Sequence, residues 1–166
     1  AAEIQNEELQ KTPDKTQKYN KALTYLESLK EKVLKTDKEK ELFNRITNDK
    51  EMIFYSFQQI NSKNSQDVRM KWISFITEAL TQNSDNFETK KLITNQIEEL
   101  VTKQDISSVK DSKLRKSLAA DQIELLSYLY RYDFERAKQF KTEITDEYKQ
   151  KLFAFTESYY FNNFQK

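Results

Sequence analysis

The sequence predicts an all-α protein, and three features of its composition indicate this class. Glycine is absent from all 166 residues, although average usage of about 7% would supply roughly a dozen. β-Hairpin turns and phosphate-binding loops depend on glycine, so its absence argues against sandwiches, barrels and nucleotide-binding α/β folds. Proline occurs once, at Pro13, and leaves every later residue free to be helical. The balance of 37% hydrophobic and 33% charged residues is typical of slim helices that each bury one stripe.

The length favours one domain, and we expect a bundle of five to six helices. Residues 1–13 are polar, lack periodicity and end in the proline, so we interpret them as a tail or tether. A frayed extension of the first helix is the alternative. Residues 14–166 are the predicted helical bundle domain.

Asp14 and Gln17 resemble a capping box at the start of the first predicted helix. Apolar residues then recur at alternating steps of three and four, the spacing of a seam that packs on a neighbouring helix. They are Tyr19, Ala22, Leu26, Leu29 and Val33. Thr36 and Glu39 form a second capping box, so we expect a new helix to begin there and to run to about residue 60. A polar gap at 48–50 marks a bend or a wet stretch in that helix.

Two further helices are bounded by polar loops at 61–66 and 81–86. The first of them carries an apolar stripe of Val68, Trp72, Phe75, Ile76, Ala79 and Leu80. The second is expected to be capped by Asp85 and Glu88, and its stripe is Phe87, Ile93, Ile97, Leu100 and Val101. A polar connector at 103–112 precedes the next helix, which begins near Lys113.

The remaining chain has helical spacing without a breaker, so its division is open. Either one long C-terminal helix runs from about 113 to about 162, or the chain turns back near Thr142–Thr145. Two helices are favoured, because helices much beyond 25 residues are unusual in compact domains.

The stretch SYLYRYDFERAKQF, residues 127–140, alternates aromatic residues at every second position, which is also the spacing of a β-strand. A lone strand among helices would have no partner, so we interpret the stretch as helix. On a helical wheel the alternating aromatics then bracket a leucine stripe on both sides. Tyr130 and Phe134 lie on one margin, and Tyr128 and Tyr132 lie on the other. A stripe this wide predicts a central helix that touches two or more neighbours.

Asp133 and Arg136 fall within the same apolar arc and are three residues apart. Buried charge is costly unless it is paired and hydrogen-bonded. One interpretation is that both side chains reach out to water where the helix leaves the core. The other is an internal ion pair that sets the register of the last two helices.

The outer arc of this helix is the predicted partner-binding surface, because tyrosine and arginine are enriched at binding hot spots. Its residues are Tyr128, Arg131, Tyr132 and Glu135. In the alternative, the tyrosines only cover the flank of the bundle. The C-terminal region adds Tyr160 and Phe161, since 12 of the 21 aromatic residues lie between Tyr128 and Phe164. One helical stripe cannot bury them all, so we expect at least one of the last aromatics to be exposed or covered by a partner.

Several chemistries are excluded by composition. Histidine and cysteine are both absent, so Ser-His, Cys-His and zinc-thiolate sites cannot form. We predict no catalytic residues, no cofactor and no metal site. The formal net charge of +1 gives no basic surplus, so we expect no nucleic-acid partner. No apolar run approaches the length of a transmembrane segment.

The lysine, asparagine and phenylalanine content, connectors such as NSKNSQ and the ending YYFNNFQK resemble the small all-helical outer-surface lipoproteins of Borrelia spirochaetes. The resemblance is one of composition and style and carries no binding residue with it. It implies a tethered, non-enzymatic bacterial surface domain that binds a host protein. The lipid-bearing cysteine of such proteins is absent here, which implies trimming upstream of Ala1, and membrane contact would run only through that anchor.

The expected function is therefore a non-enzymatic, surface-exposed helical binding module, tethered to the outer membrane, whose partner is a host protein. The alternative is a self-associating structural or scaffold protein that binds a second copy through its aromatic C-terminal region. A third interpretation is an intracellular regulator or nucleic-acid accessory protein.

Overall fold

Eight α-helices form the part of the chain that the structure describes, residues 15–163, and that part contains no strand. The structure is a computed structural model. The helices are α2 (Lys15–Lys30), α3 (Asp37–Thr47), α4 (Lys50–Gln58), α5 (Gln66–Gln82), α6 (Phe87–Lys103), α7 (Ser112–Tyr132), α8 (Phe134–Glu143) and α9 (Glu147–Asn163). The all-α prediction is confirmed. The predicted tail and the Asp14 cap lie outside the described residues.

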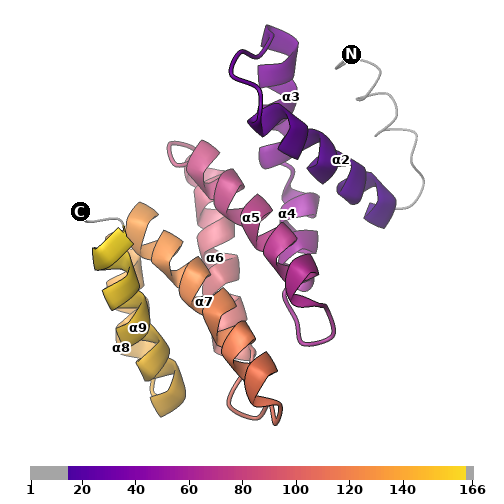
Figure 1. Cartoon of the computed structure of the whole chain (residues 1–166). Coiled ribbons are helices and arrows are strands. Elements are labelled where there is room, and N and C mark those ends of the chain that lie inside the picture. The colour runs from indigo at the N-terminus through magenta and orange to yellow at the C-terminus, as the bar shows by residue number, and fades with distance from the viewer. Residues whose placement is uncertain (1–14, 164–166) are drawn as a thin grey trace.

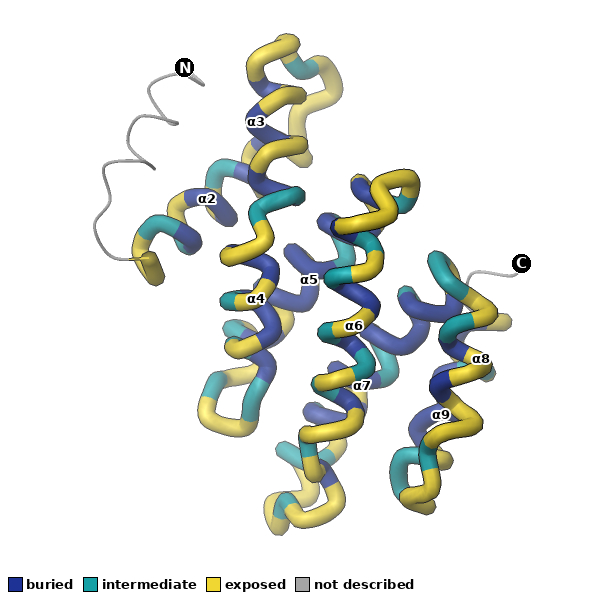
Figure 2. Tube along the Cα trace, turned by 180° about the vertical axis from the view of Figure 1, so that it is seen from behind, coloured by how far each residue is buried: buried dark blue, intermediate teal, exposed yellow. Residues whose placement is uncertain are grey.

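From α4 onward the helices alternate between two layers (Figures 1 and 2). α5, α7 and α9 lie side by side in one layer, and α4, α6 and α8 form the other. α2 and α3 extend this array at the end opposite α8 and α9. α7 contacts α5, α6, α8 and α9, as the wide stripe of the sequence predicted for a central helix.

The helix count exceeds the expected five to six because two predicted helices are broken. The polar gap after α3 is a full interruption: Asn48 ends α3, and the Asp49 carboxylate accepts from the Met52 N–H at 3.0 Å to start α4. Asp133 separates α7 from α8 with φ −150° and ψ 72°, and its carboxylate accepts from the Arg136 N–H. At both breaks a carboxylate satisfies a backbone donor that the new helix would otherwise leave unpaired.

The predicted break near Thr142–Thr145 is confirmed, because α8 ends at Glu143 and α9 begins at Glu147. The cap of α6 is Asn86 and not Asp85: the Asn86 side-chain oxygen accepts from the Thr89 N–H at 3.3 Å.

The predicted apolar seam of the first helix is buried only up to the end of α2. Tyr19, Ala22, Leu26 and Leu29 are buried, but α2 ends at Lys30. Val33, predicted as the last seam residue, lies in the following loop and is 96% exposed. Phe87, predicted for the stripe of α6, is also exposed, at 74%, because it is the first residue of its helix.

One continuous core runs between the two layers (Figure 2). Its centre is built from fully buried side chains of α5, α6 and α7, namely Trp72, Ile76, Leu80, Ile93, Ile97, Leu125 and Leu129. A smaller cluster of Ile106, Leu118, Ala119 and Leu152 seals the connector at 104–111 against α7 and α9. Ile106 anchors that polar connector and is 2% exposed.

The predicted Thr36–Glu39 capping box is confirmed. The Glu39 N–H donates to the Thr36 hydroxyl oxygen at 3.1 Å, and the Thr36 N–H donates to Glu39 Oε1 at 2.9 Å. The Lys32 ammonium donates to the other carboxylate oxygen at 2.5 Å. The Lys32 and Thr36 hydrogen bonds to the charged form lower the pKa of Glu39 from its usual 4.5 to about 2.

This lowered pKa makes stability pH-dependent. The folded state holds the Glu39 proton less tightly than the unfolded chain, so its stabilisation is complete above pH about 4.5 and is lost as pH falls toward about 2. We expect Glu39→Gln to lower the free energy of unfolding at neutral pH, and the variant and the parent to converge as acid protonates the parent. Urea denaturation at neutral pH and in acid measures this. Glu41→Gln, an exposed neighbour on α3, is the control. A Glu39→Gln deficit of the same size at every pH would contradict the assignment.

Candidate binding surface

The predicted outer-arc tyrosines of α7 lie against α5. Tyr128 and Tyr132 are one turn apart and stack, with ring centroids 6.2 Å apart and an interplanar angle of 23°. The Tyr132 hydroxyl donates to Thr81 Oγ1 of α5 at 3.0 Å. Both rings are half-buried and pack against the main core, and burial raises the pKa of the Tyr128 hydroxyl. Each of the two tyrosines therefore packs one part of its side chain against the bundle and exposes the other part to solvent.

Arg131 and Glu135 were predicted to share this surface on one helix, and the structure places them on two helices, α7 and α8. The Arg131 guanidinium carbon lies 5.4 Å from the centroid of the Tyr132 ring, a cation–π arrangement on an exposed side chain. Glu135 lies in the first turn of α8, beyond the non-helical Asp133. The wheel that placed it beside Tyr128 assumed one unbroken helix, and that assumption is wrong.

α9 extends the surface on the other side of α7. The Tyr159 hydroxyl donates to Glu124 Oε2 of α7 at 3.3 Å. Burial first, and then the Glu124 carboxylate, raise the pKa of the Tyr159 hydroxyl. Phe155 lies one turn before Tyr159 on the same side of α9 and is 66% exposed. We call the following residues the aromatic band: Tyr128, Arg131, Tyr132, Phe155 and Tyr159.

The other two predicted residues, Tyr160 and Phe161, belong to a separate cluster. The Tyr160 ring lies 5.8 Å from Tyr130 and 6.2 Å from Phe134, and only 7% of this residue is exposed. This burial corrects the prediction of Tyr160 as a partner contact: it is a core residue between α7 and α9. Phe161 is 47% exposed and packs edge-on against Tyr160 at 5.4 Å. The expected exposure among the last aromatics is confirmed by Tyr159 and Phe161, and Phe164 lies outside the described residues.

Asp133 and Arg136 do not form the ion pair that would set the register of the last two helices, and Arg136 does not simply reach out to water. Arg136 Nε donates to Glu98 Oε2 at 2.5 Å and Nη1 donates to Thr94 Oγ1 at 2.5 Å. Its Nη2 also donates to Asn95 Oδ1. All three partners are on α6, so this side chain ties α8 across to α6.

Sequence reasoning missed the most buried charges in the described chain. Arg69 of α5 is 1% exposed and Asp121 of α7 is 6% exposed, and Arg69 Nε donates to Asp121 Oδ2 at 2.7 Å. A signal was present. Arg69 precedes Trp72, Ile73 and Ile76 at helical spacing, and Asp121 stands between Leu118 and Leu125 in the same way. A charge inside an apolar stripe of each of two helices indicates a buried partner.

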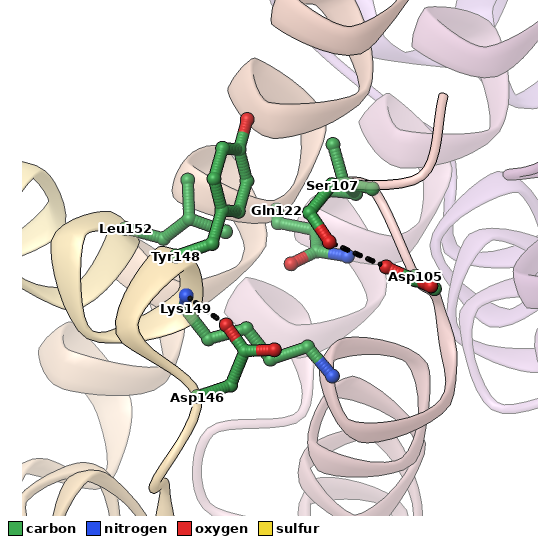
Figure 3. Close-up of a pocket in the computed structure, with 8 residues that line it drawn as sticks. Asp105, Ser107, Gln122, Asp146, Tyr148, Lys149 and Leu152 are labelled. Carbon is green, nitrogen blue, oxygen red and sulfur yellow. Dashed lines mark hydrogen bonds between the residues drawn. The ribbon is translucent and has the colours of Figure 1, made fainter. Parts of the chain in front are cut away.

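Three hollows of the described surface do not resemble an enclosed active site. One, of about 460 Å³, is open and lined by Lys30, Lys35, Lys40, Phe43, Asn44, Glu78 and Gln82. A hollow of about 200 Å³ lies beside the Arg136 cluster. A third lies between α9 on one side and the connector residues Asp105 and Ser107 on the other, with Gln122 of α7 between them (Figure 3). The buried Gln122 Oε1 accepts no hydrogen bond from the described protein, but this hollow leaves essentially no room for a ligand, ≈ 0 Å³.

Residues 15–163 contain no cluster of three or more acidic side chains placed to hold a metal ion. Within the same residues, no helix combines the length and apolar character needed to cross a bilayer. Comparison with protein-family models, with curated proteins and with solved structures gives no match.

The half-buried placement of the tyrosines can be tested by a double-mutant cycle. Tyr132→Phe removes the hydrogen bond to Thr81 and keeps the ring, so we expect a loss of about 0.5–1 kcal/mol in the free energy of unfolding. Thr81→Ala should cost a similar amount, and the double variant little more than either single variant, because both remove the same bond. Strictly additive losses would show that Tyr132 does not contact Thr81 in solution.

Proposed function

We propose that this chain is a non-enzymatic helical binding module and that the aromatic band is its partner-binding surface. The single observation that carries the proposal is Phe155, a large aromatic side chain that is 66% exposed beside Tyr159. Contiguous exposed apolar patches rimmed by polar residues mark interaction sites, whereas a single exposed apolar residue does not, so the proposal takes Phe155 together with the neighbouring Tyr159.

The composition and rigidity of the band suit protein recognition. Tyrosine and arginine are the residue types most enriched at binding hot spots, and the band holds three tyrosines and one arginine. Contacts with Thr81 and Glu124 hold two of its rings before any partner arrives. Rings that are already ordered lose less side-chain freedom on binding, which favours affinity.

The proposed setting comes from the resemblance to the outer-surface lipoproteins of Borrelia. In this setting the domain is tethered to the outer membrane of a bacterium and contacts a host protein. No enzymatic role is proposed, because the sequence lacks histidine and cysteine and the hollows are open or too small.

The experiment is capture of host serum proteins on the immobilised chain, followed by titration of the captured protein against variants. Phe155→Ala removes an exposed ring and should leave the helical content unchanged. If Phe155 is a hot spot, its loss should weaken binding about thirtyfold, corresponding to about 2 kcal/mol. Arg131→Ala should weaken the same binding and leave folding intact.

Phe87→Ala is the matched control, because Phe87 is an equally prominent aromatic at 74% exposure on α6, outside the band. The proposal requires Phe87→Ala to bind as the parent does. Equal binding by Phe155→Ala and Arg131→Ala would overturn it. If light scattering instead shows a dimer that Phe155→Ala dissociates, the band binds a second copy, and the self-associating alternative replaces the host partner.

A further inference from the structure

A second exposed apolar feature lies outside the aromatic band, in the loop between α2 and α3. Val33 is 96% exposed and Leu34 is 86% exposed, the two highest values among the large hydrophobic residues that the structure describes. They are adjacent in a loop at the end of the array opposite α8 and α9 (Figures 1 and 2). A contact that covers this adjacent apolar pair would be favourable, because it removes apolar surface from water.

Lysines surround this apolar pair. Residues 30–40 contain five lysines against three acidic residues, Glu31, Asp37 and Glu39. Lys32 pairs with Glu39 at 2.5 Å, Lys30 lies 3.9 Å from Glu78, and the Lys35 ammonium donates to the Lys32 carbonyl at 3.3 Å.

Three of these lysines, Lys30, Lys35 and Lys40, border the hollow of about 460 Å³ next to the loop. Lys35 and Lys40 both line it, and the Lys35 ammonium lies 5.6 Å from the centroid of the Phe43 ring. Glu78 is the only carboxylate in this lining, and its partner is Lys30. The hollow therefore offers two ammonium groups beside an exposed apolar tip.

We propose that this loop is a membrane-contact tip that docks on an anionic lipid surface. Val33 and Leu34 enter the boundary between headgroups and acyl chains, and Lys35 and Lys40 meet the lipid phosphates beside them. Binding to an anionic bilayer is strengthened both by apolar side chains that enter the interface and by basic residues that are attracted to the lipid headgroups. A protein partner fits less well, because a stable protein interface needs about 800 Å² on each side, and two adjacent side chains at a loop tip supply little of that. The contact is weak, reversible and additional to any lipid anchor.

Co-sedimentation with lipid vesicles tests the proposal. The intact chain should partition onto vesicles that contain phosphatidylserine and far less onto vesicles of phosphatidylcholine alone. Val33→Ser/Leu34→Ser should lower the partition coefficient roughly tenfold or more, because two apolar groups no longer insert. Lys35→Gln/Lys40→Gln should lower it about thirtyfold, and added salt should weaken the binding of the parent. Phe87→Ser, which removes an exposed aromatic at the start of α6, is the matched control and should bind as the parent does.

The absence of cysteine allows a direct test of insertion. Leu34→Cys provides the only thiol, and an environment-sensitive dye attached there should shift to shorter wavelength on phosphatidylserine vesicles. The same dye at Phe87→Cys should not shift. The proposal is overturned if the parent does not bind these vesicles, if Val33→Ser/Leu34→Ser binds as well as the parent, or if the dye at position 34 stays in water on bound protein.

Discussion

The buried pair of Arg69 and Asp121 is the interaction on which the rest of the structure depends. Besides its contact with Asp121, the Arg69 guanidinium donates to the Asn64 carbonyl at 2.8 Å and to the Ser117 hydroxyl. One side chain thus joins the loop before α5, α5 itself and α7. Burial raises the pKa of Asp121, and the hydrogen bond and charge of Arg69 oppose that rise. Neither charge could remain in this core without the other.

The position of α7 determines which aromatic residues remain available for binding. Once α7 is fixed against α5, its two aromatic margins acquire different roles. The margin with Tyr130 turns inward and packs on Tyr160 of α9, whereas the margin with Tyr128 and Tyr132 follows α5 and stays half open. The exposure of the aromatic band therefore follows from the orientation of α7 against α5 and α9. The Arg136 contacts with α6 then hold α8 in the second layer.

Most of the fold followed from local rules in the sequence, because capping boxes and apolar stripes act over a few residues. The Thr36–Glu39 box was predictable for this reason, whereas the turn before α9 was expected only because an unbroken helix would have been unusually long. The break at Asp133 was not: neither glycine nor proline marks it, and aspartate is tolerated inside helices at modest cost. Its cause is tertiary, since the new direction of α8 lets Arg136 reach three side chains of α6. The prediction that Val33 is buried was wrong for the opposite reason, because the apolar spacing continued after the helix itself had ended.

For the candidate surface, the sequence predicted that aromatic residues flank both sides of the leucine stripe of α7, but it did not predict that Phe134 and Glu135 belong to α8 or which aromatics remain exposed. Tyr160 and Phe161 are neighbours in the sequence, yet one is buried and the other is not, and only the packing of α9 on α7 decides between them. Phe155 was hidden within a continuous run of helical spacing. Its exposure depends on the rotation of α9 about its own axis, which no local pattern specifies.

The most direct test of the central claim is a double-mutant cycle on the buried pair, measured by urea denaturation at neutral pH. Arg69→Met and Asp121→Leu each leave one buried charge without its partner, and each should lower the free energy of unfolding by about 3–5 kcal/mol. The double variant removes both charges and should recover most of that loss. Single variants within about 1 kcal/mol of the parent, or a double variant whose loss equals the sum of the two, would contradict the claim that this pair sets α5 against α7.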